Sequence, residues 1–415
     1  MKFLYQAFII LYPLAVRLAS PFNRKAKLWL DGRKNIFKKL QAVIDHSQPI
    51  VWMHCSSLGE FEQGRPLIEK VKQQYPAYKI LITFFSPSGY EVCKNYEHAD
   101  YVFYLPMDSA NNAKHFITIV QPTLIIFVKY EFWHHYLHEA KARNIPTLLI
   151  SSIFRKSQPF FKSYGNFYRK MLSCFTHIFV QNEESVLQLQ SIQFEKDVTI
   201  VGDTRFDRVI EIAEKAEPIL VLENFLKNKE VIVAGSTWLE DDKELAHFVN
   251  TMMDIMFIIA PHNIEKERLQ ECLKIYKRAA LFSTISKGIP ASTNAIVIDN
   301  IGLLSRLYKY ATIAYVGGGF GGDGVHNVLE PAVYGKPVVF GPEYEKYFEA
   351  IELVDTKGAT TVESVIELEA TFVRLLKKDN EYDQCCKAAK EYVYSKRGAT
   401  DKLLQFIQAN RLLTN

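Results

Sequence analysis

Short runs of β-branched, aliphatic and aromatic residues alternate with amphipathic stretches over most of the chain beyond residue 48. This alternation is typical of parallel strands that are covered by helices on both faces. Seven runs are expected as strands in the first half of the chain, at 50–53, 79–85, 101–104, 123–128, 146–151, 177–181 and 198–201. A second series is expected at 230–235, 255–260, 295–298, 312–316 and 337–340. The pattern predicts an α/β protein with two doubly wound, Rossmann-like domains.

The segment 202–229 separates the two series and contains no run that reads as a strand. It begins with GDTRFDRV and continues as a helical stretch rich in Lys and Glu, so we place the domain boundary there. Two doubly wound domains that face each other bring the carboxyl ends of both sheets to a shared cleft, where ligands bind. Residues that follow directly after strands are therefore the first candidates for function.

The first 40 residues differ from the rest in charge and hydropathy. They carry nine cations and one anion, a net charge of +8, whereas the other 375 residues sum to −4. The apolar run 3–20 is interrupted by Pro13 and Arg17 and precedes most of these cations. We interpret 1–40 as a membrane-attachment segment, with an apolar face in the acyl region. The cations that would contact headgroups are Arg24, Lys25, Lys27, Arg33 and Lys34, and Trp29 would lie at the interface. A packed helix of a soluble domain remains the alternative.

Several other classes do not fit the composition. A cleaved signal peptide carries its cations before the apolar core, whereas here most of them follow it. A nucleic-acid partner is not expected, because the excess positive charge is confined to residues 1–40, the head of the chain, and the other residues are mildly acidic in sum. The six cysteines are scattered without C-x-x-C spacing, so neither a disulfide framework nor a metal site is indicated. This cysteine pattern suits a reducing cytoplasm.

In the first domain, the turn HCSSLGEFEQG follows strand 50–53 and leads into a helix that starts at or near Glu60. A carboxylate in a first helical turn has a structural explanation, since it can cap free amides. On a strand-to-helix turn beside the cleft, the same Glu60 can act as a general base. Two further turns follow strands: SPSGYE opens a helix after 79–85, and KYEFW places Glu131 beside an aromatic pair after 123–128.

In the second domain, VIVAGSTWLEDDKE is again a strand, a small-residue turn and a helix, where Ser236 and Thr237 can bind a phosphate. His262 follows the next strand in IIAPHN. The glycine-rich segment 315–342 leads into His326, Asn327 and Glu330 at a short helix. The spacing of Asn327 and Glu330 matches a capping box, and it equally suits a nucleotide site with a carboxylate on the ribose hydroxyls.

The dinucleotide fingerprint is satisfied literally by Gly317-x-Gly319-x-x-Gly322, with Glu343 at the end of strand 337–340. In that fingerprint the third glycine packs inside the opening helix. Here Asp323, Gly324 and Val325 extend the loop instead, so nicotinamide binding is not favoured.

The ordered motifs SSLGE, TFFSPSGYE, YLPMD, YEFW, GDTRFD, AGST, GVHNVLEP and GKPVVFGP resemble those of the 3-deoxy-D-manno-octulosonic acid (Kdo) transferases, glycosyltransferase family 30. The head segment LASPFNRKAKLWLDGRK is also similar to that family's membrane-proximal segment. The resemblance covers nearly the whole chain. It implies a GT-B fold and transfer of Kdo from CMP-Kdo to a lipid A precursor in lipopolysaccharide synthesis, at the cytoplasmic face of the bacterial inner membrane.

The resemblance also assigns domains. Residues 41–205 correspond to the N-terminal acceptor-binding domain and 206–380 to the C-terminal CMP-Kdo domain, while 381–415 form a C-terminal helix that can return to the first domain. Glu60 matches the family's catalytic base. The acceptor-binding residues implied are Ser57, Gly59, Ser86, Lys129, Glu131 and Arg155. The donor-binding residues implied are Ser236, Thr237, His262, Gly318, Gly319, Gly324, His326, Asn327 and Glu330.

The chain departs from the family pattern at several of these places. Trp238 replaces the histidine of S-T-H, Lys129 stands for the first glutamate of E-x-E, and Arg205 replaces the lysine of K-F-D. APHN replaces P-R-H-P, so the roles of Lys129 and His262 stay open. We expect one in-line inverting step with Glu60 as base, and no metal or other cofactor besides the donor CMP-Kdo. A GT-B sugar-nucleotide epimerase, another GT-B glycosyltransferase, and a non-catalytic nucleotide-sugar or lipid-binding protein are the alternatives.

Overall fold

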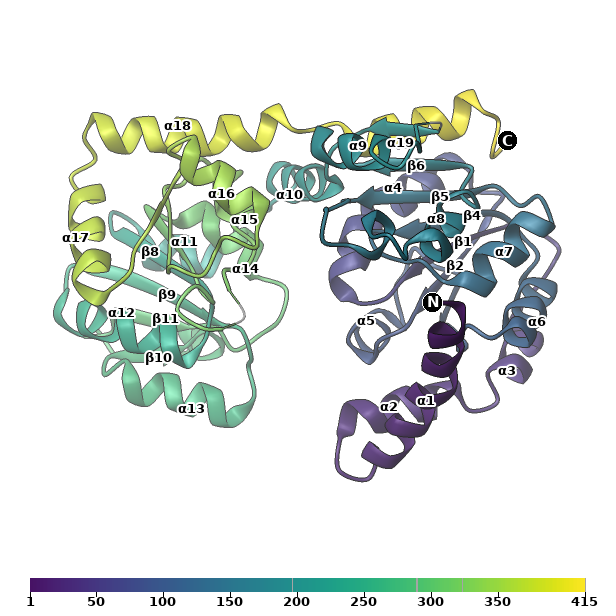
Figure 1. Ribbon diagram of the computed structural model, residues 1–415. Coiled ribbons are helices and arrows are strands. Elements are labelled where there is room, and N and C mark those ends of the chain that lie inside the picture. Colours follow the sequence, from purple (N-terminus) through teal and green to yellow (C-terminus); the bar gives the residue numbers. More distant parts are fainter. Residues whose placement is uncertain (196, 289, 323, 415) are drawn as a thin grey trace. The chain divides into compact units, whose positions relative to one another are not determined.

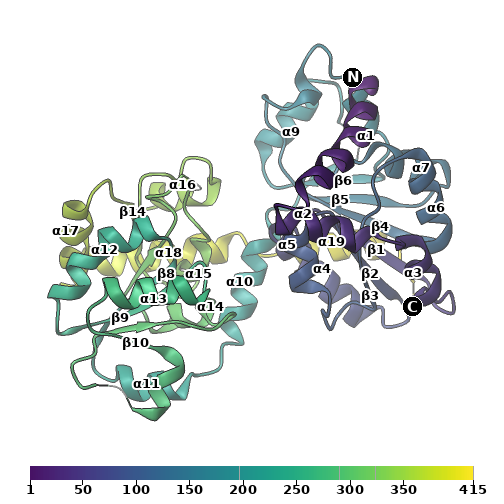
Figure 2. The same ribbon diagram turned by 90° about the horizontal axis from the view of Figure 1, so that it is seen from below.

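The computed structural model of the chain describes residues 1–195, 197–288, 290–322 and 324–414. It divides into two compact units: unit 1 comprises Met1–Asp207 with Gly398–Asn415, and unit 2 comprises Arg208–Arg397. In each unit a parallel sheet is covered by helices on both faces (Figures 1 and 2).

The sheet of unit 1 has the order β3-β2-β1-β4-β5-β6-β7, and its described strand pairs are all parallel. Its strands are β1 (Ile50–Cys55), β2 (Lys79–Phe84), β3 (Tyr101–Tyr104), β4 (Pro122–Val128), β5 (Thr147–Ser152), β6 (His177–Val180) and β7 (Val198–Ile200). Its helices are α1 (Lys2–Ala19), α2 (Arg24–Arg33), α3 (Ile36–Val43), α4 (Leu58–Gln74), α5 (Pro87–Cys93), α6 (Ala110–Val120), α7 (His134–Ala142), η1 (Pro159–Phe161), α8 (Asn166–Leu172), α9 (Glu183–Gln190) and α19 (Ala399–Ala409).

Alternate residues of the strands in unit 1 enter different cores, because side chains point to opposite faces of a sheet. Trp52 belongs to the cluster that α6 and α7 cover, whereas Met53 belongs to the cluster that α4 and α19 cover. Both faces of β1 are therefore buried, which explains why this strand is apolar almost throughout.

The sheet of unit 2 has the order β10-β11-β9-β8-β12-β13-β14, and its described pairs are also parallel. Its strands are β8 (Glu230–Thr237), β9 (Ile255–Pro261), β10 (Ala279–Leu281), β11 (Ala295–Val297), β12 (Ile313–Val316), β13 (Val338–Phe340) and β14 (Ala359–Thr361). Its helices are α11 (Leu220–Leu226), α12 (Leu239–Thr251), α13 (Lys266–Ile275), η2 (Phe282–Lys287), α14 (Leu304–Leu307), η3 (Tyr308–Tyr310), α15 (Leu329–Ala332), α16 (Phe348–Asp355), α17 (Val365–Leu375) and α18 (Asn380–Ser395).

All twelve predicted strands are present, and two short edge strands were missed. β10 and β14 have three residues each and lie at opposite edges of the second sheet. Their sequences, AAL and ATT, are too short to show a period of two. The segment 202–229 contains α10 (Thr204–Glu214) and α11 but no described strand, as predicted.

The chain returns to unit 1 after α18. Asp207 in α10 accepts hydrogen bonds from the backbone N–H groups of Gly398, at 2.6 Å, and Thr400, at 2.7 Å. It also accepts from the Thr400 hydroxyl at 2.7 Å, so the last aspartate of GDTRFD caps the start of α19. The expected C-terminal segment 381–415 is thus divided, with α18 in unit 2 and α19 packed on α4.

The helix α1 has two different faces. Ile9 is buried, and Tyr12 packs edge-on against Trp29 at a ring separation of 5.5 Å. The exposed apolar side chains of the opposite surface are Phe3, Leu4, Phe8, Ile10, Leu11, Leu14 and Leu18. By length and composition α1 is the one described helix that could cross a membrane, and its apolar surface fits the predicted attachment segment.

Two residues of the predicted membrane contact instead pack against other parts of unit 1. Trp29 is only 5% exposed. Arg33 stacks 3.9 Å from the Trp29 ring and donates to the carbonyl oxygens of Leu105, at 2.9 Å, and Phe85, at 2.8 Å. Burial lowers the pKa of Arg33 to about 9. The headgroup assignment of Arg33 and the interfacial assignment of Trp29 were therefore wrong, while Arg24, Lys25, Lys27 and Lys34 are exposed.

Candidate active site

The order of the first sheet reverses between β1 and β4, which lie side by side although β2 and β3 separate them in sequence. At such a switch point the loops after the two strands turn to opposite faces of the sheet and leave room for a ligand. The predicted carboxylates occur in these two loops, since Glu60 follows β1 and Glu131 follows β4.

Glu60 is the third residue of α4 and forms a capping box with Ser57. Its Oε2 accepts a hydrogen bond from the Ser57 backbone N–H at 2.7 Å and a short one from the Ser57 hydroxyl. Both donors reach the same oxygen. The structural explanation for Glu60 therefore applies, and both of these hydrogen bonds use Oε2 rather than Oε1.

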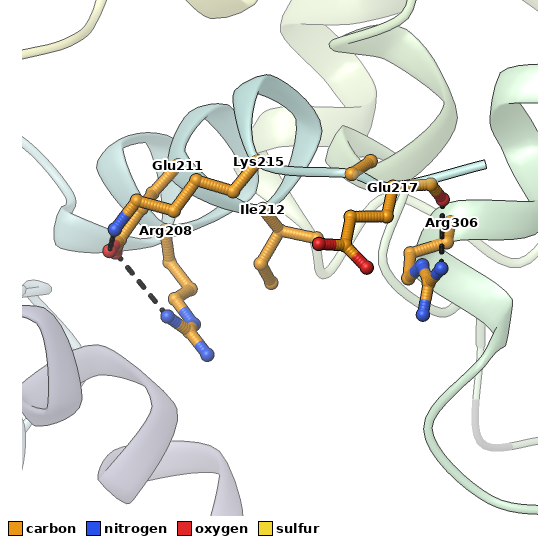
Figure 3. A pocket seen from close by; sticks show the side chains of 7 residues that line it. Arg208, Glu211, Ile212, Lys215, Glu217 and Arg306 are labelled. Atoms are coloured by element: carbon orange, nitrogen blue, oxygen red, sulfur yellow. Dashed lines mark hydrogen bonds and ion pairs between the residues drawn. The ribbon is translucent and has the colours of Figure 1, made fainter.

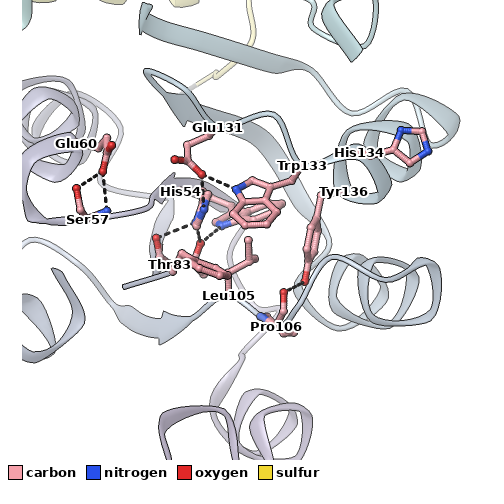
Figure 4. Close-up of polar contacts among 12 residues, drawn as sticks. His54, Ser57, Glu60, Thr83, Leu105, Pro106, Glu131, Trp133, His134 and Tyr136 are labelled. Carbon is pink, nitrogen blue, oxygen red and sulfur yellow. Dashed lines mark hydrogen bonds and ion pairs between the residues drawn. The ribbon is translucent and has the colours of Figure 1, made fainter. Parts of the chain in front are cut away.

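Glu131 ends a buried polar chain that the sequence did not reveal (Figure 4). Its Oε2 lies 3.0 Å from the Nε2 of His54 and accepts a short hydrogen bond from the Trp133 indole. The Nδ1 of His54 lies 2.8 Å from the hydroxyl of Thr83, which also accepts from Trp52 at 2.8 Å. The carboxylate is only 4% exposed, so this chain fixes its position.

The two carboxylates act on one side chain at the end of β1. Burial raises the pKa of the Cys55 thiol, and the negative charges of Glu60 and Glu131 raise it further. Glu60 and Glu131 thus both lie near the end of β1.

Tyr130 lies in the same region. Burial raises the pKa of its hydroxyl, Arg155 and Arg205 lower it, and Glu60 raises it. Lys129 adopts a left-handed backbone with φ of 68°, and its Nζ lies 5.4 Å from the Tyr130 ring centre. Lys129, Arg155 and Arg205 therefore lie near Tyr130 together with Glu60.

The other predicted acceptor residues have local roles in the fold. Ser86 caps α5, its hydroxyl accepting from the Ser88 N–H at 3.3 Å, and its own N–H donates to Ser56 at 2.7 Å. This backbone bond joins the turn after β2 to the turn after β1. Gly59 is exposed in the first turn of α4, and Arg155 is exposed after β5.

In unit 2 the switch point lies between β8 and β12, and the glycine-rich loop follows β12. Gly318 has φ of 93°, and a Cβ there would lie 2.3 Å from the carbonyl oxygen of Gly324. A Cβ on Gly319 would lie 2.5 Å from the backbone nitrogen of Gly341. These glycines are required because two backbone segments cross closely.

A buried aspartate holds this loop. Asp241 is fully buried and accepts from the Gly318 N–H at 2.9 Å, the Trp238 N–H at 2.8 Å and the Tyr315 hydroxyl at 2.7 Å. Burial raises its pKa, and these hydrogen bonds oppose the increase. Sequence reasoning missed Asp241, although its position three residues after Trp238 is an N-capping signal.

Three rings from three separate motifs stack beside the loop. The ring of His262 stacks on both the Trp238 and the His326 ring, with a centroid distance of 4.5 Å to each. The Trp238 indole also donates to the Nε2 of His326 at 2.9 Å. The residue that departs from the S-T-H pattern therefore contacts both predicted donor-site histidines.

The remaining predicted donor residues lie on the same loops. Ser236 has a left-handed backbone, and the Thr237 carbonyl accepts from the His262 N–H at 3.0 Å. The side-chain amide of Asn327 donates to Glu330 at 3.2 Å, and its oxygen accepts from the Leu329 N–H at 3.2 Å. The N-cap of α15 is Val328, so the expected capping box at Asn327 was wrong in detail.

Unit 1 contains a pocket of about 350 Å³ at Glu131. Its lining is Tyr5, Ser56, Tyr130, Glu131, Phe132, Trp133, Gln158, Pro159, Phe160 and Tyr168. A pocket of about 300 Å³ in unit 2 is lined by α10, the residues that follow it and Arg306 (Figure 3). In the latter, Arg306 donates to the Glu217 carbonyl at 2.8 Å, and no predicted site residue lines it. Within the described ranges, no three His, Cys, Asp or Glu side chains are grouped as metal ligands.

Residues 31–208 match the family model described as 3-deoxy-D-manno-octulosonic-acid transferase (kdotransferase). The chain is 26% identical to the 3-deoxy-D-manno-octulosonic acid transferase of Haemophilus influenzae, over 86% of each protein. It is also 26% identical to a bifunctional glycosyltransferase/methyltransferase of Fusobacterium nucleatum, covering 97% of this chain but only 61% of that protein.

The fold has solved counterparts. The UDP-GlcNAc 2-epimerase of Neisseria meningitidis, bound to UDP-GlcNAc, superposes with a TM-score of 0.62 at 16% identity, over 87% of this chain and 100% of the other. At that identity the likeness shows the GT-B fold alone. The family model and the sequence relatives support a glycosyltransferase enzyme.

Within that class, the predicted resemblance to Kdo transferases is confirmed. The family model and the relatives support the assignment of this chain as a Kdo transferase.

Proposed function

We propose that the protein transfers Kdo from CMP-Kdo to a lipid A precursor, as an inverting glycosyltransferase. The observation that carries this proposal is the pair of carboxylates, Glu60 and Glu131, at the switch point of the first sheet in a chain whose relatives are Kdo transferases. The donor would bind to unit 2 and the acceptor to unit 1.

The reaction needs a base and a stabilised leaving group. As the acceptor oxygen forms its bond to the anomeric carbon of Kdo, the bond from that carbon to the CMP phosphate breaks. The hydroxyl proton passes to Oε1 of Glu60, because Ser57 occupies Oε2. CMP leaves with the electron pair, so its phosphate gains negative charge in an oxocarbenium-like transition state.

The donor phosphate would lie on the loops of unit 2. Ser236, Thr237 and the glycine-rich loop offer backbone N–H groups and hydroxyls, and such donors stabilise charge that develops on a leaving group. Glu330 would accept the ribose hydroxyls, since a carboxylate is the usual partner of both. The reaction as proposed needs no metal or further cofactor.

The proposed location of the protein in the cell follows from the membrane-bound acceptor and from the apolar surface of α1. A lipid A precursor lies in a membrane, and the exposed apolar face of α1 beside Arg24, Lys25 and Lys27 suits an anionic bilayer surface. We place the protein at the cytoplasmic face of the bacterial inner membrane.

Mass spectrometry of a lipid A precursor incubated with CMP-Kdo and the protein tests the proposal. We expect a product heavier by one or two Kdo units, and the number measures how many are added. An acceptor that is unchanged with active CMP-Kdo would contradict the proposal.

The second candidate is a GT-B sugar-nucleotide epimerase, because solved structures with this fold include such enzymes. An epimerase converts its nucleotide sugar without an acceptor. Consumption of a nucleotide sugar to an epimer in the absence of lipid would favour this candidate over transfer.

A further inference from the structure

The pocket at Glu131 is lined mainly by rings. Six of its ten lining residues are aromatic: Tyr5, Tyr130, Phe132, Trp133, Phe160 and Tyr168. Its volume of about 350 Å³ lies in the range of small-ligand pockets. Aromatic faces provide large, rigid apolar walls, whereas a carboxylate provides a strong hydrogen-bond acceptor. This combination suits a sugar ring, which has apolar C–H faces and a rim of hydroxyls.

The carboxylate of Glu131 is held in position for a hydrogen bond with such a ligand. Both of its described contacts, with His54 and Trp133, use Oε2. Glu131 lines the pocket, neither of these contacts uses its Oε1, and the His54–Thr83 hydrogen bond keeps its partner His54 in place. A ligand hydroxyl would gain a charge-assisted hydrogen bond without reorganisation of the site.

One wall of the pocket comes from the head of the chain. The hydroxyl of Tyr5 in α1 donates a short hydrogen bond to Asp108 and accepts from the His134 N–H at 3.2 Å. Asp108 is buried and also accepts from the N–H groups of His135 and Tyr136, each at 3.0 Å. The first turns of α1 are thus attached to the beginning of α7, directly after Trp133.

We propose that this pocket binds a pyranose ring of the lipid-linked acceptor, and that Tyr5 positions it by forming one wall. The inference rests on the proposed function, and it assigns the helix α1 a second role. The exposed apolar face of α1 contacts the membrane while its other face shapes the sugar site. A lipid-linked saccharide suits this arrangement better than a free sugar, because one helix joins the bilayer to the pocket.

The kinetic test is Tyr5→Phe, which keeps the ring and removes the hydroxyl. We expect the KM for a detergent-dispersed, short-chain acceptor to rise about five- to tenfold, as for loss of one buried hydrogen bond to a charged group, with KM for CMP-Kdo unchanged. Tyr5→Ala should raise it further.

The matched control is Leu14→Ser, on the exposed face of the same helix. It should weaken binding to phosphatidylglycerol vesicles and leave the KM for the dispersed acceptor unchanged. Equal KM values in Tyr5→Phe and the natural protein would overturn the inference while the transferase activity stands.

A binding measurement separates the inference from the proposed function. The probe is the deacylated, bis-phosphorylated glucosamine disaccharide, and the readout is saturation-transfer NMR on the full chain. We expect binding to the natural protein and at least fivefold weaker binding to Glu131→Gln and Tyr5→Phe. Binding of this kind without Kdo transfer would support the site and contradict the proposed reaction, whereas no binding, or binding unaffected by either variant, would overturn the site.

Discussion

The two units hold their candidate residues by different means. In unit 1 the carboxylates are held by other side chains: Glu131 by His54 and Trp133, and Glu60 by Ser57. In unit 2 the corresponding loop is held by close backbone crossings at Gly318 and Gly319 and by one buried carboxylate, Asp241. A substitution that removes a polar atom should therefore affect unit 1 most, and one that adds an atom should affect unit 2 most.

The largest effect is expected for Glu60→Gln. The amide oxygen can still accept from the Ser57 N–H, but the side chain can no longer take a proton, so turnover should fall about 10²- to 10⁴-fold. CMP affinity, measured by calorimetry, should be unchanged. Ser57→Ala is the control, since it loses the hydroxyl of the cap and keeps the base. Near-normal turnover of Glu60→Gln would mean that capping is its whole role.

His54→Leu should destabilise unit 1 by about 3 kcal/mol, because it leaves the buried Glu131 carboxylate without one of its partners. Urea unfolding followed by fluorescence would measure the loss. In a Glu131→Gln background the same substitution should cost clearly less, because no charge remains to be left unpaired. Additive losses in the double variant would contradict a coupled pair.

Glu330→Ala should weaken CMP binding by about 1.5–3 kcal/mol if the carboxylate accepts the ribose hydroxyls. Calorimetry on the full chain is the measurement. Unchanged CMP affinity in Glu330→Ala, together with a lower melting temperature, would make Glu330 a purely structural residue.

Gly319→Ala should destabilise unit 2 by about 1–3 kcal/mol, because its Cβ would lie 2.5 Å from the Gly341 backbone. Gly322→Ala, in the same loop, is the control, since nothing lies within 4 Å of its Cβ. Thermal unfolding should shift by several degrees for the former and hardly at all for the latter. Equal shifts would remove the contrast between the two units.

The smallest effect concerns pH. Burial lowers the pKa of His134 to about 4, and the nearby His138, His135 and Lys2 contribute. The folded state therefore favours the neutral ring, and stability should be lost as pH falls from about 6.5 toward 4. His134→Gln should flatten this loss in melting curves between pH 7.5 and 4.5. An identical pH dependence in both proteins would exclude His134 as its source.

The fold was predictable because the sequences of most strands are recognisable as short apolar runs. β1, β4 and β9 are long apolar runs that are buried on both faces, and β2 and β5 are similar. The three-residue edge strands β10 and β14 carry too few residues for a pattern, and they follow from sheet pairing rather than from local sequence.

The candidate site was predictable only in part. Glu60 and Glu131 follow strands, so their positions are local information. Thr83 was missed because it lies within a predicted strand, and His54 was expected in the turn after 50–53 although β1 extends through it; their contact joins residues 29 positions apart, which no local pattern reveals. Arg33 was misassigned for the same reason: its acceptors, Leu105 and Phe85, are distant in sequence.

The hydrogen bonds of Asp207 with Gly398 and Thr400 have a consequence for biosynthesis. Unit 2 is continuous in sequence and is inserted between the two parts of unit 1. A ribosome releases the chain from its N-terminus, at about 5–20 residues per second. Unit 1 therefore emerges first but lacks α19 until the whole of unit 2 has been synthesised, and the apolar surface of α4 that α19 covers stays open until then. The unit that begins first is therefore completed only after unit 2, and its α4 surface is apolar and uncovered during that interval.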